Sequence, residues 1–425
     1  MSGEAEIRAA GRVVGDALAG VVGVVRDTHR AIADRAFAAG GPAAQPIRAA
    51  HGLIAGGVYA TVAGAHALVP RLIGVAVGEG WRPERPPLSG SRAGRFALAV
   101  LNGLWGDTLS GRHPELATPM AVRSHGEDVA LTGEALRAAF PAAGPRIAVF
   151  VHGLCETEDY WSLAARRHHG TPEMTLGARL RRDHGYTPVH LRYNTGLHVS
   201  DNGLRLAALL EELVAHWPAA VERIALIGHS MGGLVIRSAG RQGAAAGHRW
   251  VPAVRHAIFL GTPHLGAPLA RGVHTAAWLL ARFPESRPVA RLIGGRSAGV
   301  HDLNYGALVE EDWRDVDPGE LPRDLCTDVP FLPDAAHHFI GATLARRHDG
   351  PLATVLGDLF VPYRSAAGLG ERRSVPFDSG NGRHLGGLHH FDLLNHPEVH
   401  DQVCAWLAGP PAPAPPGDAP AGPAR

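Results

Sequence analysis

The segment Gly228-His229-Ser230-Met231-Gly232-Gly233 constrains the fold of this 425-residue chain more than any other stretch. It follows residues 223–227, a short apolar run typical of a buried strand, and precedes residues 234–239, whose apolar positions recur at helical spacing. Glycine at 228 and 232 leaves room for a turn tight enough to strain the serine backbone, and glycine at 233 lets the helix approach the sheet. This order of strand, sharp turn and helix indicates a nucleophile elbow that presents Ser230 at a helix N-terminus.

The spacing Gly-x-Ser-x-Gly alone is a weak signal, because the chain contains 54 glycines. Residues 295–299 also fit it, with Ser297 at the centre. The residues that follow, 300–306, show no clear helical stripe, so the context of an elbow is missing there. We therefore predict that Ser297 is a loop serine and that Ser230 is the nucleophile.

Apolar runs alternate with helical stripes along residues 118–407, which we interpret as one domain. After an opening strand, turn and strand within 120–131, the expected strands are residues 146–151, 188–193, 223–227, 256–260 and 338–344, and the expected helices are 176–184, 204–217 and 234–239. This alternation predicts an α/β fold with a mostly parallel, doubly wound sheet, helices on both faces and sites at the carboxyl ends of the strands. About 70 residues separate 264 from 338, too many for a plain connection, so we interpret approximately 267–336 as a cap insertion.

The rest of the chain divides into four segments. Residues 1–80 read as a Gly/Ala-rich helical region, 81–95 as a linker, 96–117 as a connecting helix and 408–425 as a disordered Pro/Ala tail. In the first segment, an amphipathic helix is expected over 6–37, followed by the uncharged stretch 52–70. These helices could pack on the domain or on each other, contact a membrane surface or contribute a membrane span, and the sequence leaves these alternatives open.

The composition argues against several classes of function. All 41 basic residues are arginine, and 40 acidic residues balance them. The near-neutral net charge therefore gives no sign of a nucleic-acid-binding protein. The three cysteines, Cys155, Cys326 and Cys404, are widely separated and indicate neither a disulfide framework nor a zinc site. Charged residues interrupt the N-terminus where a signal peptide needs an apolar run. We expect a cytoplasmic protein without metal or cofactor, with peripheral membrane contact through the N-terminal region as the open alternative.

A serine nucleophile needs a histidine to take its proton, and this chain contains 26 histidines. In a fold of this kind the histidine lies on the loop before the last helix, which is predicted to begin at Pro397. The candidates in this region are His384, His389, His390, His396 and His400. We favour His390 as the base, with His389 and then His396 as alternatives.

The acid that orients the base must lie between the elbow and His390 in the chain order Ser, Asp, His. Residues 257–281 contain no Asp or Glu, which excludes a position directly after the next strand. Asp358 follows the strand predicted at 338–344 and is our choice, while Asp349, before Gly350, is the alternative. For the oxyanion, the expected donors are the backbone N–H groups of Met231 and of Leu154, in the loop after strand 146–151.

At these residues the sequence resembles the lipase and esterase branch of the α/β-hydrolases, including bacterial lipases and GPI inositol-deacylase-like proteins. Five ordered segments look like the oxyanion strand, the elbow, the end of the next strand, the acid loop and the histidine loop of that branch: residues 151–154, 228–233, 261–266, 357–362 and 390–394. The resemblance covers about residues 120–407. It implies an α/β-hydrolase fold and an ester hydrolase with Ser230, Asp358 and His390 as its triad.

The sequence therefore supports the hypothesis of a serine hydrolase that cleaves a carboxylic ester or lipid, with an apolar acyl chain, through an acyl-enzyme intermediate. A thioesterase, or an acyltransferase that excludes water, would use the same three residues. A hydrolase-fold protein that binds a membrane or a partner without cleaving anything is the alternative from another class.

Overall fold

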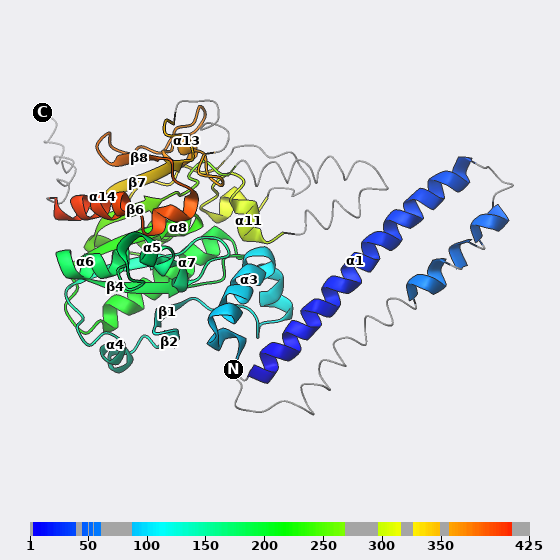
Figure 1. Ribbon diagram of the computed structural model, residues 1–425, viewed down its shortest axis with the longest axis horizontal. Coiled ribbons are helices and arrows are strands. Elements are labelled where there is room, and N and C mark those ends of the chain that lie inside the picture. The colour runs from blue at the N-terminus through cyan, green and yellow to red at the C-terminus, as the bar shows by residue number, and fades with distance from the viewer. Residues whose placement is uncertain are drawn as a thin grey trace, which may run out of the picture.

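The computed structural model describes residues 3–39, 45–49, 51–53, 55–60, 87–267, 296–315, 326–348 and 357–409. Within these residues, eight strands form one sheet in the order β2-β1-β4-β3-β5-β6-β7-β8 (Figure 1). Strand β1 pairs antiparallel with β2 and β4, and every other neighbouring pair is parallel. The expected fold class, a mostly parallel sheet of the α/β-hydrolase type, is thereby confirmed.

The central strands are buried on both faces, which explains why they read as continuous apolar runs rather than as alternating patterns. In β3, for example, every residue from Ile147 to Val151 is buried. The bounds of the strands are β1 Ala121–Ser124, β2 Glu127–Val129, β3 Arg146–Val151, β4 Tyr186–Arg192, β5 Arg223–His229, β6 Val254–Leu260, β7 Ala336–Thr343 and β8 Gly382–Gly386.

Helices cover both faces of the sheet (Figure 1). On one face Leu210 of α7 and Leu234 of α8 join a buried apolar cluster with the strands, and on the other face Leu180 of α6 and Val403 of α14 do the same. Pro397 begins α14 and His396 caps it, as the sequence indicates. The helices of this domain are α3 Arg92–Arg112, α4 Gly133–Ala139, α5 Ala165–His169, α6 Leu176–His184, α7 Val199–His216, α8 Met231–Ala245, α11 Ala298–Asp302, α13 Tyr363–Ala366 and α14 Pro397–Ala408, with 3-10 turns at Leu88–Gly90, Glu158–Ser162, Val251–Ala253, Glu310–Asp312 and His390–Leu394.

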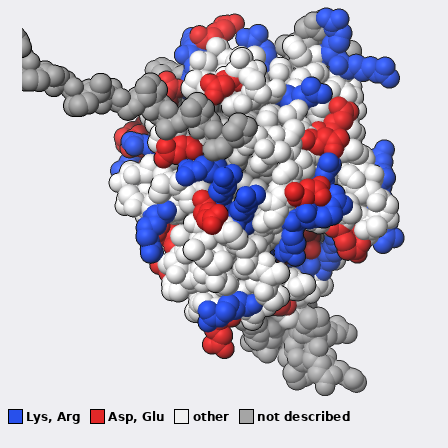
Figure 2. Space-filling model, turned by 90° about the vertical axis from the view of Figure 1, so that its left-hand side faces the viewer, with Lys and Arg blue, Asp and Glu red and all other residues white. Residues whose placement is uncertain are grey.

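The surface that carries α6 and α14 shows arginine and acidic side chains interspersed (Figure 2). The charges pair locally, because the Arg179 guanidinium of α6 lies 2.7 Å from the Asp401 carboxylate of α14. Arg182 and Asp183 form another exposed pair at 2.6 Å. This face therefore presents no extended field of one sign.

The long helix α1 (Gly3–Ala39) extends away from the sheet domain beyond its first turns (Figure 1). Near its start, Ala9 is buried in a small apolar cluster with Leu98 and Leu109 of α3. Glu6 accepts a hydrogen bond of 2.8 Å from the Ser89 hydroxyl. Across the described part of the chain, no helix is both long enough and apolar enough to cross a membrane.

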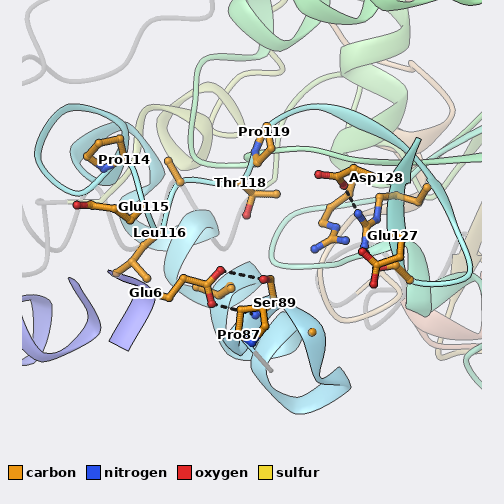
Figure 3. Close-up of a pocket in the computed structure, with 16 residues that line it drawn as sticks. Glu6, Pro87, Ser89, Pro114, Glu115, Leu116, Thr118, Pro119, Glu127 and Asp128 are labelled. Atoms are coloured by element: carbon orange, nitrogen blue, oxygen red, sulfur yellow. Dashed lines mark hydrogen bonds and ion pairs between the residues drawn. The ribbon is translucent and has the colours of Figure 1, made fainter. Parts of the chain in front are cut away.

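A cavity of about 750 Å³ separates the start of α1 from the β1–β2 hairpin (Figure 3). The buried guanidinium groups of Arg123 and Arg192 reach it, and Arg123 is ion-paired with Asp128 and Glu158. Ser230, Asp358 and His390 do not line this cavity. It belongs to the junction between the N-terminal region and the edge of the sheet.

Several predicted segments fall on residues outside the described ranges. Most of the predicted cap, residues 268–295 and 316–325, lies there, as do residues 61–86 of the N-terminal region and linker and residues 410–425 of the predicted tail. The alternative acid, Asp349, also lies outside the described residues. The proposed domain boundaries remain predictions.

Candidate active site

Ser230 occupies a strained turn between β5 and α8. Its φ of 52° and ψ of −124° lie outside the regions that L-residues ordinarily adopt, and its N–H donates to the Leu260 carbonyl at 2.8 Å. The glycines make this turn sterically allowed: a Cβ on Gly232 would lie 2.2 Å from the Val151 carbonyl oxygen, and a Cβ on Gly233 would lie 2.0 Å from the Thr262 hydroxyl. The local sequence therefore forces α8 close to β3 and presents Ser230 at the carboxyl end of the sheet.

His390 and Asp358 form a buried pair. The His390 Nδ1 lies 2.7 Å from the Asp358 Oδ2, and only 3% of His390 and 1% of Asp358 are exposed. The other carboxylate oxygen of Asp358 accepts the N–H groups of Phe360 at 3.0 Å and Val361 at 2.8 Å. These contacts fix the acid loop and aim the carboxylate at the imidazole.

The acid loop adopts this shape through two residues with positive φ, Gly357 at 53° and Leu359 at 91°. The Asp358 carbonyl also accepts the backbone N–H of His390 at 3.0 Å, which ties the acid loop to the histidine loop through the main chain as well. Burial lowers the pKa of His390, but the charge of Asp358 and its hydrogen bond outweigh burial, so the pKa lies above the ordinary histidine value. The pair can therefore stabilise a histidine that gains a proton.

The His390 ring lies beside the strand ends that carry the elbow. A Cβ on Gly261, the residue after β6, would lie 3.0 Å from the His390 Nδ1 and Cε1 atoms. Leu260, the preceding residue, accepts the Ser230 N–H, and the rings of His229 and His390 lie 4.6 Å apart between centroids. The structure thus brings the three predicted residues to neighbouring strand ends.

The predicted oxyanion donors lie next to Ser230. A Cβ on Gly153 would lie 2.9 Å from the Ser230 Cβ, so the loop after β3 passes directly beside the serine. The Gly153 N–H is occupied by Glu156 at 2.8 Å, whereas no group among the described residues accepts the Leu154 N–H. Met231 is the first residue of α8, where backbone N–H groups have no partner within the helix. The Leu154 and Met231 N–H groups are thus available to an incoming oxyanion.

The alternative residues have other roles. Ser297 is fully buried, and its hydroxyl donates to the Gly103 carbonyl at 2.6 Å and accepts the Val300 N–H at 3.4 Å. Ser297 lies in the loop before the five-residue helix α11, as predicted, and its side chain caps that helix, which is too short to leave a helical stripe in the sequence. The exposed His389 side chain pairs with Asp392, and His396 caps α14.

Glu156 and His229 form a second buried pair next to the site, and the sequence predicts a catalytic role for neither of them. The Glu156 carboxylate lies 2.8 Å from the His229 Nδ1. His229 belongs to the elbow segment, and nothing in the sequence singles out Glu156. Their pairing across 73 positions becomes visible only in the fold.

The neighbouring groups offer no other obvious chemistry. Burial raises the pKa of the Cys155 thiol to about 11, so this thiol is not activated. Within the described ranges, no three His, Cys, Asp or Glu side chains converge as a metal site would require.

Comparison with known proteins agrees with this geometry. Residues 143–303 match a protein family described as "Putative serine esterase (DUF676)". This span holds the oxyanion loop and the elbow, and the sheet around it has the topology described above. The chain has the α/β-hydrolase fold. The match to serine esterases agrees with the resemblance to the lipase and esterase branch.

Solved structures of similar fold include a lipase, an esterase and a monoglyceride lipase. This chain is 21% identical to the mature form of the Bacillus licheniformis lipase BlEst2, with a TM-score of 0.40 over 62% of this chain and 94% of that one. It is 15% identical to an esterase from Pyrobaculum calidifontis, with a TM-score of 0.35 over 62% and 77% of the two chains. It is 13% identical to a soluble variant of monoglyceride lipase from Saccharomyces cerevisiae, with a TM-score of 0.38 over 63% and 87%. None of the curated proteins matches the sequence.

Proposed function

We propose that this α/β-hydrolase is a serine hydrolase that cleaves carboxylic esters, with Ser230 as nucleophile, His390 as general base and Asp358 as the acid that orients the base. The observation that carries the proposal is the buried His390–Asp358 pair, 2.7 Å apart, beside a serine held at a φ of 52°. The match of residues 143–303 to a serine esterase family supports the reaction class.

In the proposed cycle the Ser230 hydroxyl oxygen attacks the ester carbonyl carbon while the His390 Nε2 takes the hydroxyl proton. The N–H groups of Leu154 and Met231 hold the oxyanion of the tetrahedral intermediate. Its collapse expels the alcohol, which leaves with the proton from His390, and the acyl group stays on Ser230. A water that gives its proton to His390 then attacks the acyl-enzyme, and the carboxylic acid leaves as the serine regains its proton.

The rim of the acid loop favours an apolar acyl chain. Leu359 is 53% exposed and Phe360 is 43% exposed, although both are large apolar residues. The Phe360 ring lies 5.4 Å from the His390 ring between centroids. An acyl chain bound at Ser230 could cover this surface and remove it from water, which favours lipid-like esters over small polar ones.

A thioesterase or an acyltransferase would use the same residues and differ in the leaving group or in the acceptor. Parallel assays separate these reactions: hydrolysis of a matched oxygen ester and thioester, each with and without an added alcohol. We expect the oxygen ester to be hydrolysed without an added acceptor. A strict requirement for the alcohol would favour the acyltransferase.

The proposed nucleophile is tested by mass spectrometry of the intact protein after reaction with a fluorophosphonate, which phosphonylates activated serines. We expect one label on the wild type, the same label on Ser297→Ala and no label on Ser230→Ala. Ser297 is the matched control because it shares the Gly-x-Ser-x-Gly spacing but is fully buried. Label retained on Ser230→Ala would refute the assignment, and an unlabelled wild type would favour a protein that binds without cleaving.

A further inference from the structure

A second carboxylate and histidine lie directly behind the proposed site. Glu156 is 4% exposed and His229 is fully buried. The His229 Nδ1 lies 2.8 Å from the Glu156 Oε1 and 3.0 Å from its Oε2, and Oε2 also accepts the Gly153 N–H at 2.8 Å. One carboxylate therefore holds the oxyanion loop on one side and the elbow on the other.

The histidine extends this connection to the loop of the proposed base. The His229 Nε2 lies 3.3 Å from the backbone carbonyl oxygen of His390. Both ring nitrogens of His229 thus lie within hydrogen-bond distance of an oxygen atom. Burial raises the pKa of Glu156, but its contacts with His229 and Gly153 lower that pKa more, which keeps the carboxyl ionised as the acceptor.

The Glu156–His229 couple is not placed to react with a substrate. Glu156 takes up the Gly153 N–H, and it faces the histidine that precedes Ser230 rather than the serine itself. Together Glu156 and His229 contact three chain segments whose relative positions matter for the proposed reaction: the oxyanion loop, the elbow and the histidine loop.

We propose that Glu156 is a positioning residue that, through Gly153 and His229, sets the oxyanion loop against Ser230 and His390; this inference rests on the proposed function. The important property of Glu156 is the reach of its side chain, because one head group must meet both the Gly153 N–H and His229. A glutamine can keep this geometry, since its side chain has the same length, its carbonyl accepts the Gly153 N–H and its amide reaches the His229 Nδ1. An aspartate keeps the charge but is one methylene too short.

The test compares the hydrolysis of a soluble p-nitrophenyl ester by Glu156→Gln and by Glu156→Asp. The concentration of active enzyme is measured by fluorophosphonate labelling of the serine, so that misfolded protein does not enter kcat. Since small misplacements in an active site can lower rates about 100-fold, we expect Glu156→Asp to lower kcat about 10- to 100-fold, with KM within about 3-fold. We expect Glu156→Gln to stay within about 5-fold of the wild type. The matched control is Thr157→Val, which changes the neighbouring buried residue and removes the cap of the 158–162 turn. It should lower the melting temperature with little change in kcat.

The outcomes are separable. Wild-type kcat in Glu156→Asp, or a larger loss in Glu156→Gln than in Glu156→Asp, overturns the positioning role while the proposed function stands. A wild type without turnover and without label overturns the proposed function and this inference with it. If Glu156→Asp does not fold, His229→Asn withdraws the other end of the same couple and should give the same loss of kcat. Wild-type kcat in that variant also overturns the proposal.

Discussion

Asp358 has two tasks at the residue scale, because one of its oxygens faces the imidazole while the other binds the backbone of its own loop. An asparagine can keep the backbone contacts but can present an amide hydrogen to His390, which favours the wrong tautomer of the base. We therefore expect Asp358→Asn to lower kcat about 10⁴-fold while the protein stays folded. Steady-state kinetics on a p-nitrophenyl ester, together with a melting curve, check this.

The control for that change is the alternative acid: if Asp358 orients the base, Asp349→Asn should leave kcat within about 2-fold of the wild type. A large loss in Asp349→Asn with normal turnover in Asp358→Asn would transfer the role of the acid to Asp349.

The raised pKa of His390 gives the pH dependence its sign. A general base must be neutral to accept the serine proton, so kcat/KM should rise with pH through an inflection above about 6.5, the ordinary histidine value. Asp358→Asn removes the charge that raises the pKa of His390, while burial continues to lower that pKa. The inflection of the residual activity should therefore move to lower pH. Rates measured from pH 5 to 9 decide this, and an inflection that moves to higher pH in the variant would contradict it.

Residues marked by a local sequence pattern could be predicted, whereas residues marked only by their contacts in the folded protein could not. Ser230, Asp358 and His390 stand at positions marked by local turns and by chain order; the structure pairs His390 with Asp358 and places Ser230 at a neighbouring strand end. Glu156 is defined only by partners distant in the chain, and a local pattern carries no trace of such a contact. Buried polar pairs of this kind need the tertiary structure.

At the scale of the elements, long apolar or strongly periodic segments could be predicted well. The strand at 146–151 and the helix at 176–184 agree with β3 and α6 residue for residue. Strand β8 was not predicted, because Gly382–Gly386 contains a single large apolar residue, Leu385. It forms because the outer edge of β7 offers backbone N–H and C=O groups for pairing, and Gly382 fits there since a Cβ would lie 2.4 Å from the Phe339 ring.

The close packing of α8 on β3 gives a prediction at the same scale. In Gly232→Ala the new Cβ would lie 2.2 Å from a backbone oxygen that cannot move freely, so we expect a loss of at least about 2 kcal/mol of stability. For a domain of this size that corresponds to a fall in melting temperature of about 4 °C or more. Activity should fall as well, since the helix carries the oxyanion donor Met231.

The matched control lies on the same helix. A Cβ on Gly240 would meet only the flexible Leu332 side chain, at 3.4 Å. Alanine is the better helix residue by roughly 0.5–1 kcal/mol, so Gly240→Ala should be neutral or slightly stabilising. Equal melting temperatures for Gly232→Ala and Gly240→Ala would argue against the packing account of the elbow.

At the scale of the whole molecule, the alternation of strands and helices was enough to predict a doubly wound sheet, because short connections between parallel strands leave few arrangements. The path of α1 was not predictable, because an amphipathic pattern shows that a helix has two faces without showing what covers the apolar one. In the structure only the first turns of α1 pack on the sheet domain, around Ala9. Farther along, Val25 is 54% exposed and Ile32 is 53% exposed.

These exposed residues support the proposal that the N-terminal region contacts a lipid surface. The neighbouring segment 51–60 adds Leu53, which is 80% exposed, and lies beside α1, with the His51 ring 5.0 Å from the His29 ring. Arginines at 26, 30, 35 and 48 accompany the apolar residues, a combination typical of helices that lie on anionic membranes. Insertion of each large apolar side chain can contribute about 1.5–3 kcal/mol to binding.

We therefore expect the full chain to float with vesicles of phosphatidylcholine and phosphatidylglycerol. Ile32→Asp combined with Leu53→Asp should lower the bound fraction more than about tenfold, because the insertion free energies of the two side chains together exceed about 1.4 kcal/mol. The matched control is Leu204→Asp, an equally apolar residue that is 59% exposed on α7 of the sheet domain. It should float like the wild type and keep its esterase activity. If all three proteins stay at the bottom of the gradient, the exposed apolar face of α1 needs a protein partner instead. If Leu204→Asp alone loses binding, the lipid contact lies on the sheet domain.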